Sequence, residues 1–187
     1  MLKQLSKRID EYLIKNYSMF VNHDYGSDLY LCGGLIRDMI IGKKPKDIDL
    51  FLLNNREGIF DFIEKHNLKY KLNTFGKPKI LMDEKEIDFI PLKNLDEIIV
   101  YNIDGLFYNA SQHKFVVKGF ENALQTGRAV IVNDDLLHPN SSRFKERSAK
   151  IFGFMEELKR RGIVQEIKND IEKGDMIFDE EDEIVNE

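Results

Sequence analysis

One short segment of the chain holds residues that could together handle phosphate and bind a metal ion. Gly33 and Gly34 follow an apolar run, Arg37 comes three residues later, and Asp47 and Asp49 form an Asp-x-Asp pair. Glycines let the backbone turn sharply and let an anion approach the N–H groups of a helix start, while an arginine adds a forked cationic contact. Adjacent carboxylates repel each other unless a cation lies between them, and Mg²⁺ prefers oxygen ligands. We therefore predict a magnesium site shared with a triphosphate.

Local elements must position these side chains. The apolar residues 29–32 predict a strand, the glycines a turn, and residues 34–41 a helix. Residues 47–53 predict a second strand, on which Asp47 and Asp49 share one face because side chains alternate along a strand. Taken singly, a Gly-Gly pair is also typical of a plain turn and an Asp-x-Asp pair of a solvated strand edge. Their order and spacing favour a site.

The rest of the chain alternates between the two kinds of element. Helices are predicted over residues 3–17, 57–66, 119–125, 142–161 and 163–173, and strands over 69–75, 79–82, 86–90, 105–109, 114–117 and 128–132. Residues 80–90 predict a hairpin that turns at Asp83, Glu84 and Lys85. Asp88 lies in its second strand between apolar neighbours, either as an inward-facing ligand or on the wet face of an alternating strand.

The spacing of Gly33, Gly34, Arg37, Asp38, Gly42, Asp47 and Asp49 resembles the head-domain motif of class II CCA-adding enzymes and bacterial poly(A) polymerases. These belong to the polymerase-β-like nucleotidyltransferase superfamily. The resemblance is dense over residues 29–53 and thinner to about residue 162. It implies an α+β fold, with a mixed β-sheet, helices on one face and a short helical neck.

The resemblance also implies an activity, the Mg²⁺-dependent transfer of a nucleotide from an NTP such as ATP to a hydroxyl, with release of pyrophosphate. Asp47 and Asp49 would hold two metal ions, one activating the hydroxyl and one clamping the triphosphate. A third carboxylate on a later strand is common in the superfamily, and it favours Asp88 as a ligand. The family's Arg-Arg-Asp triplet aligns with Ile98, Ile99 and Val100, however, and its Asn with Asp104, so nucleotide affinity or selectivity is expected to differ.

A basic helix follows near the C-terminus. Arg143, Arg147 and Lys150 fall on one of its faces, which is either a solvated surface or part of a nucleotide site. Asn140-Ser141-Ser142-Arg143 is similar to the family's neck motif Glu-Asp-x-x-Arg, in which Asp and Arg read the incoming base. Asn140 stands in place of the Asp. An amide donates as well as accepts hydrogen bonds, so the preferred base is left open.

Composition limits the other possibilities. The 187 residues are 42% hydrophobic, enough for one core, and no N-terminal signal peptide or membrane-spanning run is expected. The single cysteine, Cys32, fits a reducing cytoplasm. The chain carries a net charge of −5, but residues 172–187 hold eight acidic residues and one basic residue, so that this segment carries −7 and the rest +2. The acidic segment is either a solvating tail or a mimic of nucleic-acid charge.

We therefore expect a nucleotidyltransferase head over residues 1–135, a helical neck over 136–173 and a disordered acidic tail over 174–187. The expected acceptor is an RNA 3′ end, as in tRNA processing, with a second copy of the chain or a partner protein supplying RNA grip. The alternatives are a protein or small-molecule acceptor, favoured by the modest charge of +2, and a non-catalytic binding module.

Overall fold

A computed structural model describes residues 1–74, 76–82, 85–133 and 142–168. The chain divides into two compact units. Residues 1–95 and 107–115 form the first, and residues 96–106 and 116–168 lie in the second. None of the described helices combines the length and the apolar composition needed to cross a bilayer.

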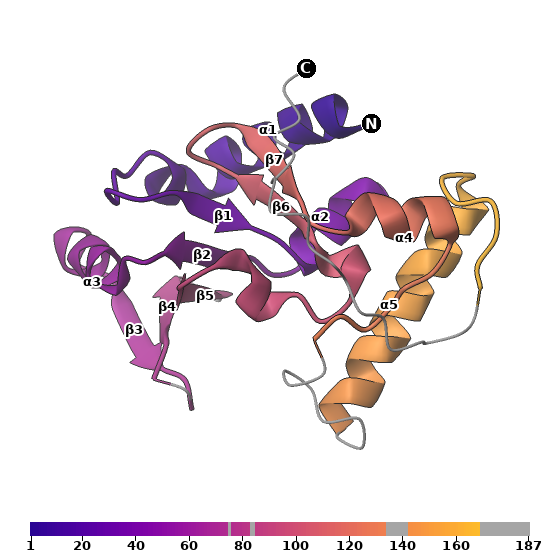
Figure 1. Ribbon diagram of the computed structural model, residues 1–187. Helices are drawn as coiled ribbons and strands as arrows, with labels where there is room; N and C mark the ends of the chain where they lie inside the picture. Colours follow the sequence, from indigo (N-terminus) through magenta and orange to yellow (C-terminus); the bar gives the residue numbers. More distant parts are fainter. Residues whose placement is uncertain (75, 83–84, 134–141, 169–187) are drawn as a thin grey trace. The chain divides into compact units, whose positions relative to one another are not determined.

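A mixed seven-stranded sheet has the order β3-β4-β5-β2-β1-β6-β7 (Figure 1). Its strands are β1 (Leu29–Leu31), β2 (Asp49–Leu53), β3 (Lys69–Leu72), β4 (Pro78–Met82), β5 (Lys85–Leu92), β6 (Leu106–Asn109) and β7 (Lys114–Val117). Strands β2 and β5 pair in parallel, whereas β1 pairs antiparallel with β2 and β6, and β4 with β3 and β5. The mixed sheet expected from the sequence is confirmed.

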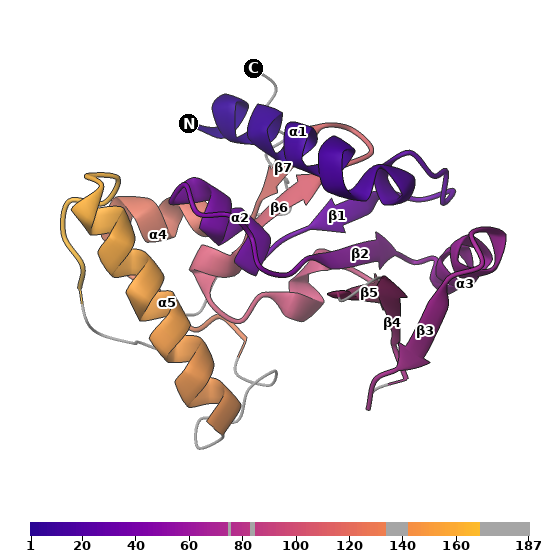
Figure 2. The same cartoon turned by 180° about the vertical axis from the view of Figure 1, so that it is seen from behind.

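Helices α1 (Leu2–Val21), α2 (Gly34–Ile40) and α3 (Arg56–Lys65) belong to the first unit (Figure 2). The rings of Phe20 on α1 and Phe62 on α3 lie 4.9 Å apart, and both lie within 6.2 Å of Phe89 on β5. Aromatic rings at these separations form a packed core. Helices α1 and α3 therefore cover the face of the sheet to which Phe89 points.

The second unit contains α4 (Phe120–Thr126), α5 (Ser142–Arg160) and two short 3₁₀ helices, Leu95–Ile98 and Asn102–Asp104, of which the first begins one residue before the unit. Helix α5 buries Ile151, Phe154 and Leu158, which recur at helical spacing, whereas Phe144 is half-buried. Two expected elements are wrong. Residues 128–132 form only an isolated bridge, Tyr101 with Ile131, and residues 163–168 are not helical. The predicted helical residues 169–173 and the acidic tail lie outside the described residues.

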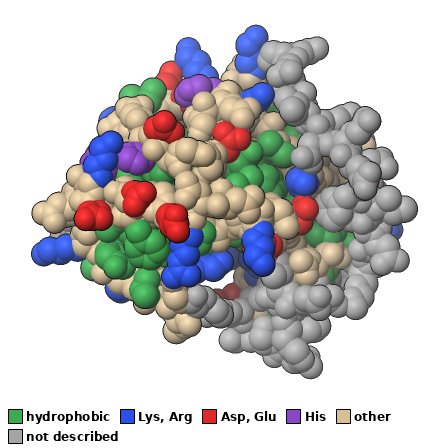
Figure 3. Space-filling view, turned by 60° about the vertical axis from the view of Figure 1, so that its left-hand side comes forward, with side chains coloured by type: hydrophobic (Ala, Val, Ile, Leu, Met, Phe, Trp, Pro, Cys, Tyr) green, Lys and Arg blue, Asp and Glu red, His purple; other side chains and the backbone are tan. Residues whose placement is uncertain are grey.

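Charged side chains of both signs are interspersed on the face drawn in Figure 3. A continuous basic surface of the kind that double-stranded nucleic acids require is absent from the described part of this face.

Candidate active site

The Gly-Gly turn lies where the sequence predicts it. Gly33 has φ +70°, a left-handed conformation that favours glycine, and its carbonyl accepts the hydrogen bond of the Arg37 N–H that opens α2. A Cβ atom added at Gly33 or Gly34 would meet no other atom within 4 Å. The space beside both glycines is thus open, and an anion could approach the start of α2 there.

The two aspartates of the Asp-x-Asp pair lie at the start of β2. The strand begins at Asp49, two residues later than expected from the sequence. Asp47 lies just before the strand and is exposed. Ile48, Leu50 and Leu52 are at most 2% exposed, as the alternating pattern predicts. Their burial fixes the orientation of this strand, so that Asp49 points to the face opposite the aromatic core.

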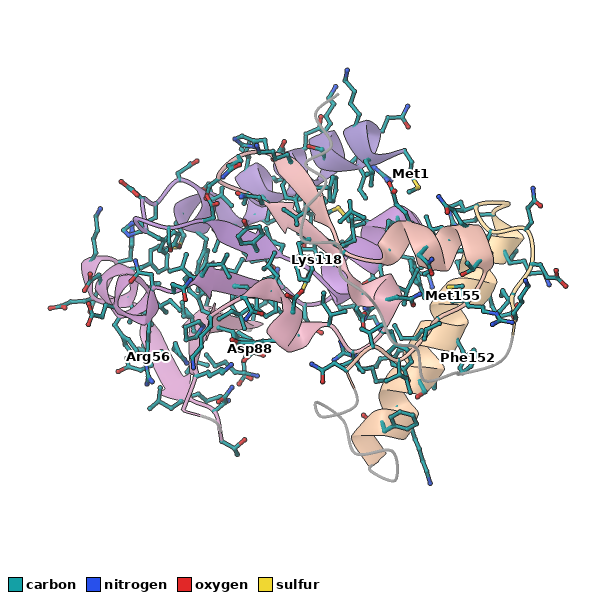
Figure 4. The ribbon with its side chains drawn as sticks, in the orientation of Figure 1. Met1, Arg56, Asp88, Lys118, Phe152 and Met155 are labelled. Atoms are coloured by element: carbon teal, nitrogen blue, oxygen red, sulfur yellow. The ribbon has the colours of Figure 1, made fainter. Side chains whose placement is uncertain are left out.

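Asp88 joins Asp49 through strand pairing. The two residues are register partners on the parallel strands β2 and β5, and partners in a sheet point to the same face. Figure 4 shows Asp88 on β5. The two carboxylates, 39 positions apart in the chain, thus face the same cavity of about 580 Å³, which Asp47 also lines. The sequence left open whether Asp88 points inward as a ligand or lies on the wet face of its strand. Both descriptions apply to the same face, because the cavity lies on the polar side of these strands.

The crowding of carboxylates changes the acidity of Asp49. Burial and the nearby charges of Asp88 and Asp47 raise its pKa to about 6, and the opposing effects of Lys79 and Arg37 are smaller. The charges of Asp47, the other member of the Asp-x-Asp pair, and of Arg37 on α2 thus both act on the Asp49 carboxylate. A site that disfavours its own negative charge in this way gains from binding a cation.

Lys79 is the site residue that the sequence did not single out. It lies on β4 as the register partner of Asp88, and its Nζ lies 3.2 Å from Asp88 Oδ2 and 3.3 Å from Glu86 Oε2. Glu86 also pairs with Lys71. A lysine in a short strand gives no local signal of a site, so only the pairing of β4 with β5 could have revealed it.

The donor set fits Mg²⁺ together with a bound phosphate. Within the described part of the chain, no three acidic, histidine or cysteine side chains are arranged to hold a metal ion by themselves. Mg²⁺ is commonly held by one or two carboxylates, with water and substrate phosphates completing its ligands, so the pair Asp49 and Asp88 suffices. Asp47 is the third carboxylate within electrostatic reach.

The remaining predicted residues lie in the second unit. Asp104 is buried, and its Oδ2 accepts a hydrogen bond of 2.9 Å from Arg147 Nη2 on α5. This pair neutralises the Asp104 carboxylate and fastens the helix to the segment before β6. Arg143 is the second residue of the same helix, and Asn140 lies outside the described residues.

The raised pKa of Asp49 predicts a pH-dependent stability. Its pKa is about 6 in the folded protein, against 3.8 for an unperturbed aspartate. The folded state thus holds the proton more tightly, and the free energy of unfolding should fall by roughly 2 kcal/mol as pH rises from 4 to 6. Asp49→Asn should remove this loss and raise the melting temperature at pH 7.5 in EDTA. Melting temperatures measured from pH 4 to 8 check it, with Asp61→Asn on the exposed side of α3 as control. An unchanged pH dependence in Asp49→Asn would contradict the assignment.

Comparison with known proteins extends the resemblance beyond the motif. The family model described as the Poly A polymerase head domain matches residues 29–176. A CCA-adding enzyme in complex with CTP is 15% identical, with a TM-score of 0.55 over 86% of this chain and 46% of that chain. An apo form of a CCA-adding enzyme is 19% identical, with a TM-score of 0.51 over 84% of this chain and 40% of that chain. A complex of a CCA-adding enzyme with ATP is 16% identical, with a TM-score of 0.51 over 83% of this chain and 40% of that chain.

The structural similarity shows that these proteins share the fold of this chain, and the family match agrees with the head domain that the sequence predicts. The chain spans less than half the length of these solved structures. No curated protein sequence matches it.

Proposed function

Since the chain belongs to the poly(A) polymerase head-domain family, we propose that it is a Mg²⁺-dependent nucleotidyltransferase that moves a nucleotide from an NTP to a hydroxyl at an RNA 3′ end. The observation that carries this proposal is the pairing of Asp49 with Asp88 on one face of the sheet, with the pKa of Asp49 raised to about 6. Such a site is built to gain from a divalent cation.

Each group has a part in the proposed reaction. The N–H groups at Gly33 and Gly34 and the guanidinium of Arg37 bind and orient the triphosphate. Asp47, Asp49 and Asp88 would hold two Mg²⁺ ions, which would supply charge neutralisation and help to activate the attacking hydroxyl. The acceptor oxygen bonds to the α-phosphorus, the bond to the β-phosphate breaks, the hydroxyl proton is released and pyrophosphate leaves.

The acceptor separates this proposal from its alternative. The interspersed charges in Figure 3 and the modest charge of the chain outside its acidic segment favour a protein or small-molecule acceptor. The relatives bound to CTP and ATP are CCA-adding enzymes, and this favours RNA. We place the activity in the cytoplasm, in keeping with the single cysteine.

Incubation of the full chain with each labelled NTP, Mg²⁺ and either total cellular RNA or lysate tests the proposal. Label on RNA is the expected result. Label on protein would establish the alternative acceptor. No label in any fraction, with NTP bound, would favour a binding module that has kept the fold.

Nucleotide choice is expected to depend on Asn140 and Arg143, whose amide and guanidinium could pair with a base edge. Because each good bidentate pair discriminates by roughly 1–3 kcal/mol, Asn140→Asp should shift the preferred NTP by about tenfold or more. If Asn140 only caps the helix, the variant should lose a little stability and keep its preference. Transfer rates with all four NTPs distinguish the two, and an identical profile in both proteins would refute base reading.

A further inference from the structure

A second hollow of the first unit lies between α1 and the loop that follows α2. Its volume is about 540 Å³, and Lys43, Lys44 and Pro45 line its loop side. Arg8, Tyr12 and Lys15 line its helix side, and Glu11 is the one acidic residue among its lining residues. We call this hollow the basic groove. It is distinct from the carboxylate cavity, with which it shares no lining residue.

Local structure explains why these residues converge. Arg8, Tyr12 and Lys15 are spaced by four and three positions, so they lie on one face of α1. Gly42, with φ +67°, turns the chain after α2, and the buried Pro45 anchors the loop so that Lys43 and Lys44 remain exposed. The basic side chains therefore come from two elements that the fold brings together.

The groove keeps its positive charge. Among the described residues, no acidic side chain forms an ion pair with Arg8, Lys15, Lys43 or Lys44. Glu11 is paired with Lys7 at 4.0 Å. Four cations facing one hollow without bound counter-charges are suited to phosphate groups.

The groove leads to the carboxylates. Pro45 lines the groove and Lys46 lines the carboxylate cavity, so that two consecutive loop residues mark the border, with Asp47 next in the chain. On the helix side the ring of Tyr12 lies 5.8 Å from that of Tyr17, which lines the carboxylate cavity. A single strand of nucleic acid held in the groove would therefore place its end near the aspartates.

We propose that the basic groove binds the single-stranded 3′ segment of the RNA acceptor, with its phosphates on Arg8, Lys15, Lys43 and Lys44 and a base stacked on Tyr12. Cationic grooves with aromatic side chains are the usual means of holding single strands without reading their sequence. Helix α1 precedes residue 29, where the family match begins, so the groove adds an element from outside the matched domain. The assignment of RNA as ligand rests on the proposed function.

The test measures binding of a fluorescently labelled single-stranded oligoribonucleotide to the full chain by anisotropy, without NTP and in EDTA. Arg8→Glu/Lys15→Glu should weaken binding at least about tenfold and lower the slope of log K against log salt by roughly 1.4, about 0.7 for each lost phosphate contact. Lys3→Glu/Lys69→Glu changes two exposed lysines outside the groove by the same charge and should have less than about a twofold effect. An equal loss of RNA affinity in both double variants would refute binding of RNA in the basic groove.

Tyr12→Leu tests stacking separately from charge. We expect about a fivefold loss or more for single-stranded RNA with an unchanged salt slope. Double-stranded RNA binding as tightly as the single strand, or an unchanged affinity in Tyr12→Leu, would overturn the single-strand assignment. Binding is measured without NTP, so the two proposals can be refuted separately. Label transfer without RNA binding in the groove would refute only the groove. RNA binding in the groove without label transfer would refute only the proposed function.

Discussion

Asp49→Ala and Asp47→Ala are each expected to lower the rate of nucleotide transfer at least about a thousandfold. Metal ions supply several kcal/mol of transition-state stabilisation, and each 1.36 kcal/mol is tenfold in rate. Asp49 is the register partner of Asp88 and lines the same cavity, so its loss removes one of the two carboxylates that strand pairing places side by side there. Single-turnover rates with a saturating NTP measure the effect.

The fold should survive both substitutions. Asp47 is exposed, so its loss should affect stability little. Burial and the neighbouring carboxylates make the ionised form of Asp49 unfavourable, so Asp49→Ala should be at least as stable as the unchanged protein near pH 7.5 in EDTA. The melting-temperature rise that Mg²⁺ causes should disappear in Asp49→Ala, since a ligand stabilises only the state that binds it. Asp61→Ala, on the exposed side of α3, should keep both activity and the Mg²⁺ effect. Near-normal transfer by either site variant would show that the metal assignment is wrong.

Gly34→Val is expected to weaken NTP binding about tenfold to a hundredfold while the protein remains folded. A Cβ atom at Gly34 meets nothing within 4 Å in the structure, so the valine fits the protein itself and fills only the space proposed for phosphate. Losing one charge-assisted contact costs about 1.5–3 kcal/mol, which corresponds to the expected range. Arg37→Ala should cost less than Gly34→Val because the backbone donors remain. Titration with ATP and CTP, followed by calorimetry or thermal shift, measures both.

Gly153→Val on α5 is the matched control. Gly153 also has nothing within 4 Å of an added Cβ, and it lies in a helix outside the proposed cradle. The control should therefore show the cost of placing valine in a helix and leave NTP affinity unchanged. A folded Gly34→Val protein with unchanged affinity would refute the phosphate cradle. Gly33 is less suitable for this test because its φ of +70° would strain any side chain.

Local sequence determined the elements that begin the site. The Gly-Gly pair required a turn, and the alternation of Ile48, Leu50 and Leu52 with polar or less buried neighbours placed Asp49 on the face away from the core. Glycine conformation and strand alternation depend on neighbouring residues only, so a single sequence contains that information. The family motif over residues 33–49 also depends on short spacing, and the family match over residues 29–176 agrees with it.

Where local patterns were ambiguous, the sequence predicted less. Residues 128–132 are rich in β-branched side chains but form a single bridge, because Asn102 and Val100 take the hydrogen bonds of Val130 and Val132 without a continuous ladder. The apolar residues 163 and 164 continue the pattern of α5, yet Gly162, with φ +71°, ends the helix before them.

Tertiary structure alone decided which distant residues meet. Asp88 faces Asp49, and Lys79 faces Asp88, because β5 pairs in parallel with β2 and antiparallel with β4. A shift of one residue in either register would turn these side chains to the opposite face, and register depends on the burial of the whole sheet. The basic groove likewise exists only because α1 packs beside the loop after α2. Sequence spacing thus determined the chemistry of each group, and strand register and helix packing determined which groups share a site.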